Sequence, residues 1–290
     1  MPHNQAVTVG QLQREAREKL TSCGVESASL DARLLIQHEL GISHEGLIAD
    51  PARPVTDVDK GAIHASLERR LRHEPVSRII GLREFFGREF IVTPDVLDPR
   101  PDTETLIEQV LAIAQMSAVS HIADLGTGSG AIIATLLAEL PNSSGMATDV
   151  SAAALLVAEQ NADRLGVGGR VRFVQTSWLD DLDGPFDVIV SNPPYIVTNT
   201  IDTLAPDVAH FDPRGALDGG ADGLDAYRTI IPQAYQKLKP GGYLCFEVGA
   251  GQADDIVDLM ASAGFVPGHQ VEQRRRDLNG HVRVVSAQIR

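Results

Sequence analysis

The fold of this chain is decided by one short stretch of sequence, Ile122-Ala123-Asp124-Leu125-Gly126-Thr127-Gly128-Ser129-Gly130. Its first four residues predict a strand, and the glycines that follow let the backbone turn sharply and come close to a ligand. The apolar residues at 131–140 then predict a helix, whose first amide N–H groups have no partner inside the helix. A strand, a glycine loop and a helix in this order indicate a binding site for a nucleotide-like cofactor.

An acidic residue, Asp149, ends the next predicted strand, 23 residues after Gly126. A carboxylate in that place accepts hydrogen bonds from ribose hydroxyls. The loop does not fit the dinucleotide pattern GxGxxG, because its third glycine comes one residue early. A Gly-x-Gly-x-Gly loop after an acidic residue favours S-adenosyl-L-methionine, which has no pyrophosphate to bind. The alternative interpretation is a glycine-rich turn that serves packing alone.

Outward from this stretch, predicted strands alternate with predicted helices. We expect strands at 122–125, 145–149, 171–175, 186–191 and 243–248, and helices at 131–140, 152–165, 224–238 and 252–263. Such alternation predicts an α/β fold, with an open, doubly wound, mostly parallel sheet and helices on both faces. Apolar residues that alternate at 282–289 predict a last, antiparallel strand.

The beginning of the chain has a different pattern. Apolar residues recur at helical spacing in three segments, which Gly24, Gly41 and Pro75 end. Residues 79–101 are rich in Phe, Gly and Pro, which predicts a hairpin that connects two domains. We therefore expect a small all-α domain at 1–80, a hairpin linker at 81–101 and the α/β domain at 102–290.

The charge of the chain disfavours one class of partner. It has 25 Lys and Arg against 39 Asp and Glu, a net charge of −14. Residues 1–85 hold 11 basic and 12 acidic side chains, which gives a net charge of −1. Residues 86–290 hold 14 basic and 27 acidic side chains, which gives a net charge of −13. So acidic a chain repels phosphate backbones, and we expect no direct binding of nucleic acid. The nearly neutral first part is the better candidate for docking a protein.

Composition also bears on location and on metals. No apolar run approaches the ~20 residues that a membrane-spanning helix needs. The first five residues lack the basic and apolar regions of a signal peptide, so we expect a cytoplasmic protein. The two cysteines, Cys23 and Cys245, are expected to be buried thiols. Neither they nor the histidines have the spacing of metal ligands, so no metal site is expected.

A second candidate site follows the strand predicted at 186–191, with the tetrapeptide Asn192-Pro193-Pro194-Tyr195. Ligands gather beyond the carboxyl ends of parallel strands, so the tetrapeptide should face the same crevice as the glycine loop. Two prolines stiffen the turn, and the Asn192 side-chain oxygen and the Pro193 carbonyl are then paired acceptors for an –NH2 group. Tyr195 offers a ring on which a planar amide or base stacks. The alternative is a rigid turn without a ligand.

Together, the glycine loop and the tetrapeptide resemble the class I methyltransferases that modify planar –NH2 nitrogens. Three further segments, PRPDTE at 99–104, GxxEF at 81–85 and ALxGGxDGL at 216–224, resemble the release factor glutamine methyltransferases (PrmC/HemK). The resemblance covers nearly the whole chain. It implies transfer of a methyl group from S-adenosyl-L-methionine to the side-chain amide nitrogen of the glutamine in the Gly-Gly-Gln motif of peptide-chain release factors.

The resemblance also implies roles for individual residues. Asn192, Pro193, Pro194 and Tyr195 would be the catalytic and substrate-binding residues. The helical domain would dock the release factor, and we expect the enzyme to be a monomer. The cofactor would be held by Gly126, Thr127, Gly128, Ser129, Gly130, Asp149, Trp178 and Asn192.

Other activities remain open from the sequence. A glutamine methyltransferase of a ribosomal protein would carry the same tetrapeptide. An adenine-specific nucleic-acid methyltransferase would too, because the tetrapeptide binds an exocyclic amine equally well. An alternative from another class is a cofactor-binding adaptor without catalysis. The roles of Glu247 and of the basic run Arg274, Arg275 and Arg276 also stay open, between ligand contacts and ordinary structural or solvated positions.

Overall fold

The computed structural model describes residues 7–180, 182–268 and 271–290. The first five residues, on which the expectation of no signal peptide rests, lie outside these ranges. The chain divides into two compact units, of which one ends at Gly81 and the other begins at Leu82. Each unit has hydrophobic clusters of its own.

The first unit is helical, as its apolar spacing predicts. Its helices are α1 Val9–Ser22, α2 Ala28–Leu40, α3 His44–Ala49, α4 Asp57–Leu71 and α5 Val76–Ile80. Thr8 begins α1 with a capping box, in which its hydroxyl accepts from the Gln11 backbone and the Gln11 side chain accepts from the Thr8 backbone. Leu12, Ile36 and Ile63, from α1, α2 and α4, are buried in one cluster.

The second unit is built on a seven-stranded sheet with the strand order β5-β4-β3-β6-β7-β9-β8. The strands are β3 His121–Leu125, β4 Ser144–Asp149, β5 Val171–Gln175, β6 Phe186–Ser191, β7 Leu238–Glu247, β8 Arg274–Arg276 and β9 Val282–Gln288. The first five are parallel to one another, and β9 is antiparallel to both of its neighbours. The chain winds outward from β3 to β5 and then returns to β6, so the doubly wound sheet is confirmed and its switch point lies between β3 and β6.

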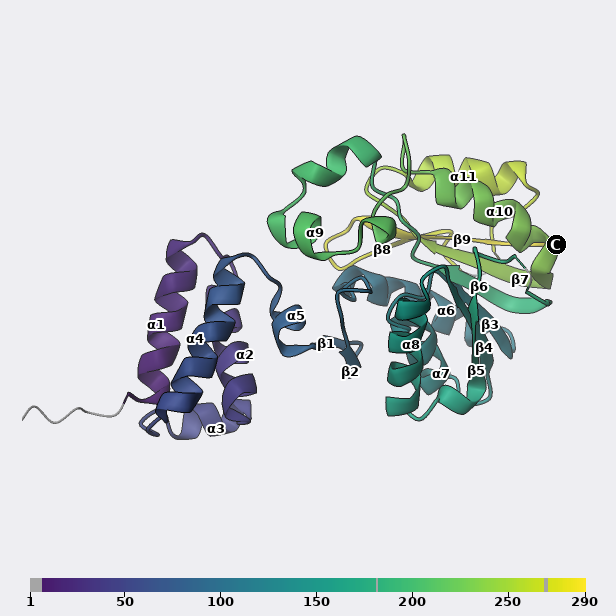
Figure 1. Ribbon diagram of the computed structural model, residues 1–290. Coiled ribbons are helices and arrows are strands. Elements are labelled where there is room, and N and C mark those ends of the chain that lie inside the picture. Colours follow the sequence, from purple (N-terminus) through teal and green to yellow (C-terminus); the bar gives the residue numbers. More distant parts are fainter. Residues whose placement is uncertain (1–6, 181, 269–270) are drawn as a thin grey trace, which may run out of the picture. The chain divides into compact units, whose positions relative to one another are not determined.

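Helices cover both faces of this sheet (Figure 1). On one face lie α6 Glu104–Ala114, α7 Ala131–Glu139 and α8 Ala152–Arg164, and on the other lie α10 Asp225–Lys237 and α11 Ala253–Ser262. Alternate residues of a strand point to opposite faces. Ile122 and Val188 accordingly belong to one buried cluster, and Ala123 and Ile189 to the other.

The hairpin expected within 79–101 consists of β1 Leu82–Phe85 and β2 Arg88–Ile91, which are antiparallel. Side chains from the rest of the second unit hold it at two places. The Glu104 carboxylate accepts from the Phe86 N–H at 2.9 Å, and the Asn161 side chain accepts from the Ile91 N–H at 2.7 Å. The remaining helical segments are η1 Pro101–Thr103, η2 Gly168–Arg170, η3 Thr198–Thr203, α9 Pro206–Phe211 and η4 Arg214–Ala216.

The structure differs from the sequence-based expectation in several details. Helix α6 was not predicted, and β7 begins at Leu238 rather than at Tyr243. Cys245 is buried as expected, but the expectation for Cys23 is wrong, because this residue is exposed. It follows the last turn of α1 as its C-cap, beyond the residues that the helix buries. Among the described helices, none has the length and apolar character to cross a membrane.

Candidate active site

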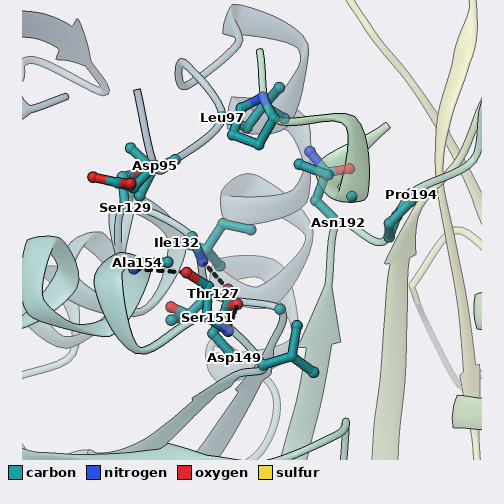
Figure 2. Close-up of a pocket in the computed structure, with 18 of the residues that line it drawn as sticks. Asp95, Leu97, Thr127, Ser129, Ile132, Asp149, Ser151, Ala154, Asn192 and Pro194 are labelled. Carbon is teal, nitrogen blue, oxygen red and sulfur yellow. Dashed lines mark hydrogen bonds between the residues drawn. The ribbon is translucent and has the colours of Figure 1, made fainter. Parts of the chain in front are cut away.

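A cavity of about 320 Å³ lies beyond the carboxyl ends of β3, β4 and β6, at the switch point of the sheet. Figure 2 shows Asp95 and Ser129 on one side of it and Asn192 and Pro194 on the opposite side. Of the predicted site residues, the following line the cavity: Gly126, Thr127, Gly128, Ser129, Asp149, Trp178, Asn192 and Pro194. Three predicted residues, Gly130, Pro193 and Tyr195, are not among the lining residues.

The glycine loop lines one side of the cavity. The Thr127 N–H donates to the Thr148 carbonyl at 2.8 Å, which fixes the loop to the end of β4. Gly130 has a φ of +76° and immediately precedes α7. A Cβ atom at Gly130 would lie only 2.9 Å from the Cβ of Ala158, so the missing side chain allows α8 to pack against the loop. Gly130 therefore has a structural role next to the cavity.

Asp149 joins the loops that follow β3 and β4 (Figure 2). Its Oδ2 accepts from the Gly128 N–H at 3.0 Å, and its Oδ1 accepts from the Ser151 N–H at 2.9 Å. Each carboxylate oxygen has a second lone pair. The side chain thus holds the loop in shape and keeps acceptor capacity for a hydroxyl in the cavity.

Asp124 is the acidic residue before the glycine loop, and no contact in the site was predicted for it. It lies inside β3 with none of its surface exposed, and its Oδ2 accepts from the Thr127 hydroxyl at 2.6 Å. Burial raises the pKa of this carboxyl to about 7. The sequence does contain a sign of this buried group, since Asp124 is a charged residue within an otherwise apolar strand. Burying a charged side chain without a partner costs folding free energy.

Trp178 forms another wall. Its ring packs against the loop, because a Cβ atom at Gly126 would lie 3.2 Å from ring atom Cζ3. The Trp178 backbone has a φ of +51°, and its carbonyl accepts from the Thr148 hydroxyl at 2.9 Å. A flat apolar surface is thereby fixed beside the glycine loop.

The tetrapeptide begins where β6 ends. The Ser191 hydroxyl donates to the Leu125 carbonyl at 2.7 Å and ties the end of β6 to the end of β3. The Asn192 side-chain Nδ2 donates to the Thr103 hydroxyl oxygen at 3.2 Å. In this orientation the Nδ2 group is held by Thr103, and the Asn192 Oδ1 is left as an acceptor.

The glycine-rich stretch at 216–224 packs directly against the tetrapeptide. The Gly219 N–H donates to the Ile196 carbonyl at 2.8 Å, and the Gln252 side chain donates to the Tyr195 carbonyl at 2.9 Å. A Cβ atom at Gly219 would lie 2.8 Å from the Tyr195 Cα, and one at Gly223 would lie 2.4 Å from the Tyr195 carbonyl oxygen. These glycines are therefore required by close backbone packing.

The charges around the cavity favour a cationic ligand. Asp95 and Asp149 line it, and Arg100, the sole basic side chain among the lining residues, forms an ion pair with the buried Asp212. Phosphate groups would need unpaired cations. Within the described ranges, no group of three or more His, Cys, Asp and Glu side chains is arranged to hold a metal ion.

At the end of the tetrapeptide, the half-buried Tyr195 lies beside the buried Glu247. The Tyr195 hydroxyl lies 3.5 Å from the Glu247 Oε1. Burial, with the nearby Glu247 carboxylate, holds the pKa of Tyr195 above its ordinary value. Burial raises the pKa of Glu247 to about 7. The stacking role predicted for the Tyr195 ring stays a prediction.

The basic run at 274–276 is engaged in contacts within the chain. Arg274 pairs with Asp254 and Arg275 with Glu108, both at 2.7 Å, and Arg276 donates to the Gly280 carbonyl at 2.7 Å. The run forms β8 at the edge of the sheet, where charged side chains discourage pairing with another strand.

Comparison with known proteins gives a consistent result. The family described as PrmC N-terminal domain matches residues 11–81, and the family described as methyltransferase small domain matches residues 100–208. A release factor glutamine methyltransferase of Bradyrhizobium diazoefficiens is 46% identical, with 94% of this chain and 92% of that protein covered. The release factor glutamine methyltransferase of Rhodospirillum rubrum is 43% identical, with 98% of this chain and 86% of that protein covered. The fold is similar to that of a methyltransferase from Pyrococcus furiosus, with a TM-score of 0.50 at 18% identity over 70% of this chain and 90% of that one.

Proposed function

The chain belongs to the release factor glutamine methyltransferase family, and on that premise we propose how its own residues perform the reaction. The enzyme transfers a methyl group from S-adenosyl-L-methionine to the side-chain amide nitrogen of a glutamine in peptide-chain release factors. The acceptor is the glutamine of the Gly-Gly-Gln motif. The products are the N-methylamide, S-adenosylhomocysteine and a proton.

The cavity residues fit this methyl donor, which supplies an electrophilic methyl group on a positively charged sulfur. A volume of about 320 Å³ is within the range of small-molecule sites. Asp149 would accept from the ribose hydroxyls, the Trp178 ring would bound the adenine, and the backbone at 126–129 would lie along the ligand. The net acidity of the lining suits a cation, and the paired Arg100 leaves no free charge for a phosphate.

One observation carries the proposed reaction: the Thr103 hydroxyl accepts from the Asn192 Nδ2, which leaves the Asn192 Oδ1 as the acceptor that would face the substrate. With the Pro193 carbonyl, it would accept both N–H bonds of the glutamine amide. An amide nitrogen is a poor nucleophile because its lone pair is delocalised into the carbonyl. Fixing both N–H bonds orients that lone pair, and well-oriented encounters contribute roughly 7–11 kcal/mol to catalysis. No Ser, Cys or His nucleophile is needed.

Two alternative acceptors share this chemistry, an adenine in nucleic acid and a glutamine in a ribosomal protein. The net charge of −13 on residues 86–290 and the paired arginines at 274–276 argue against nucleic acid. Family membership favours the release factor over the ribosomal protein.

We also propose that the helical residues 1–80 dock the release factor, because their net charge of −1 avoids long-range repulsion. The hairpin at 81–101 would connect them to a catalytic domain at 102–290. We propose a monomer that acts in the cytoplasm, where release factors work. Deletion of residues 1–80 should raise the KM for the release factor far more than that for the cofactor. Unchanged kinetics in a truncated enzyme that binds the cofactor would contradict the docking role.

The decisive experiment offers labelled S-adenosyl-L-methionine with three acceptors in parallel: a release factor, ribosomal proteins and duplex DNA. Label should enter the release factor alone, at the Gly-Gly-Gln glutamine. A release factor with Glu at that position should take no label, because a site built for two N–H donors rejects a carboxylate by about 10⁴ or more. Label in DNA, or in the Glu variant, would reject the proposed recognition of the amide.

A further inference from the structure

A small polar cluster surrounds the tetrapeptide, and the proposed reaction gives no role to its acidic member, Glu247. It consists of Thr103, at the start of α6, Tyr195, and Glu247, at the end of β7. Thr103 contacts Asn192 on one side, and the Tyr195 hydroxyl reaches Glu247 on the other. The cluster thus connects to both ends of the tetrapeptide.

Glu247 is the buried member of this cluster. It is 2% exposed, and its Oε2 has no partner with full hydrogen-bond geometry. It is the last residue of β7, an inner strand between β6 and β9, and it lies opposite Val284 of β9. A buried carboxylate without a full set of partners is costly to folding. Such a cost at the carboxyl end of an inner strand, next to the tetrapeptide, indicates that the group serves the neighbouring site.

We propose that Glu247 is a positioning residue, which orients Asn192 through the Thr103 hydroxyl and holds the Tyr195 ring directly. This inference rests on the proposed function. Glu247 does not line the cavity, so it acts through these two neighbours and does not contact the reacting atoms. Its effect is to keep the Asn192 Oδ1 turned toward the substrate amide.

The hydrogen-bond direction supports this assignment. A hydroxyl has one proton to donate and two lone pairs. The Thr103 oxygen accepts from the Asn192 Nδ2, so its proton is free to be donated to a carboxylate. Hydrogen bonding with both Thr103 and Tyr195 lowers the pKa of Glu247 against the effect of burial. The ionised carboxylate is acceptor-only, and it therefore fixes the direction of both hydroxyls.

Several charged or titratable groups face Glu247 from the surrounding elements. Asp102 raises its pKa and Arg283 lowers it, and these two side chains pair with each other at 3.0 Å. The Tyr227 hydroxyl donates to the Glu247 backbone carbonyl at 2.8 Å. With a pKa of about 7, Glu247 becomes an acceptor as the pH rises through neutrality. At saturating cofactor, kcat should therefore rise across this range.

The kinetic test compares the full-length wild type with Glu247→Gln, Thr103→Val and the double variant, on a release factor at saturating cofactor. Each single variant should lower kcat about tenfold, the factor that one lost net hydrogen bond corresponds to. The cofactor Kd should change less than about twofold. The double variant should be no slower than the slower single variant, because both break the same link. Thr103→Ser, which keeps the hydroxyl, should restore kcat.

A second measurement is independent of activity. The side-chain NH2 signal of Asn192, assigned by NMR through its loss in Asn192→Ala, should be sharp in the wild type and broadened in Glu247→Gln. The rise of kcat near pH 7 should be absent in that variant. An unaltered Asn192 signal, multiplicative effects in the double variant, or a retained pH profile would overturn the positioning role. If the wild type does not label the release factor, the proposed function fails, and the NMR measurement alone decides on Glu247.

Discussion

The glycine loop at 126–130 and the tetrapeptide at 192–195 follow neighbouring parallel strands, yet they are held in different ways. The loop takes its shape from nearby sequence, through Asp124, Thr148 and Asp149. The tetrapeptide is held by segments far away in the chain, among them Thr103 and Gln252. The hydrogen bonds of the proposed cofactor side therefore span shorter stretches of the chain than those of the proposed substrate side.

This difference has a consequence for mutations. Changes near the loop should alter cofactor affinity and leave the chemistry of the bound complex largely intact. Changes at distant residues that pack on the tetrapeptide should lower kcat without a matching loss of cofactor affinity. The following experiments test this division, from the largest expected effect to the smallest.

Gly223→Ala should be the most damaging. Its φ of +79° costs a non-glycine residue roughly 1–3 kcal/mol. The new Cβ would lie 2.4 Å from the Tyr195 carbonyl oxygen, and such overpacking adds roughly 1–3 kcal/mol. Gly166→Ala is the matched control, since Gly166 has a φ of +70° and no atom within 4 Å of its Cβ position. Denaturant unfolding and kcat should show a much larger loss at Gly223; equal losses would mean that packing on Tyr195 is unimportant.

Asn192→Ala removes the acceptor that we assign to the substrate amide. Turnover should fall roughly 10²–10³-fold, the effect of losing one preorganised polar contact to a transition state. Cofactor affinity should fall much less. The measurement is single-turnover methyl transfer together with calorimetric titration of the cofactor. Near-normal turnover would show that the tetrapeptide does not hold the nucleophile.

Asp149→Ala should have the opposite effect to Asn192→Ala: it should weaken cofactor binding more than it slows turnover. Loss of a hydrogen bond to a charged acceptor costs about 1.5–3 kcal/mol of cofactor affinity. Turnover at saturating cofactor should change little. Because Asp149 also accepts from the Gly128 and Ser151 N–H groups, Asp149→Asn serves as a control that keeps the size of the side chain. Calorimetry that finds wild-type affinity in a folded Ala variant would remove Asp149 from the ribose role.

The pH dependence of stability should show the smallest effect. The pKa of Asp124 is raised from 3.8 to about 7 in the folded state, so the folded protein binds more protons than the unfolded chain between these values. Stability therefore falls as the pH rises through this window, by about 1–2 kcal/mol between pH 6 and pH 8. Asp124→Asn should reduce the fall in Tm between these pH values. Glu247→Gln should do so too, because its pKa is shifted in the same direction.

Much of this architecture could be predicted from local patterns. The glycine loop, the five parallel strands and the three long N-terminal helices each have a periodic or turn signal of their own. The details that escaped prediction depend on tertiary contacts. Helix α6 begins at Glu104, directly after the short helix η1 that starts at Pro101, so its beginning resembles a continuation of the proline-rich connector. Strand β7 continues through Pro240, Gly241 and Gly242, which are residues typical of a turn.

In the candidate site, too, the sequence predicts the local motifs but not the tertiary contacts that orient them. The residues of both motifs could be named from the sequence, because glycines and prolines at fixed spacing are visible there. The partners that orient them could not, since Thr103 lies 89 residues from Asn192 along the chain. The basic run at 274–276 gave no sign that Asp254 and Glu108 would pair with it. Asp124 was visible only as the acidic residue before the glycine loop, and the role of Glu247 stayed open between a ligand contact and a structural position. The burial of both became visible in the folded sheet.

The position of Trp178 gives the protein a built-in optical signal. It is the single tryptophan of the chain, and its ring packs against the glycine loop at the cavity wall. Fluorescence excited selectively in tryptophan therefore originates beside the cofactor site and nowhere else in the sequence. Quenching or a spectral shift on titration would report cofactor occupancy without any label. The docking that we propose for residues 1–80, which contain no tryptophan, could be followed separately by labelling the exposed Cys23 thiol.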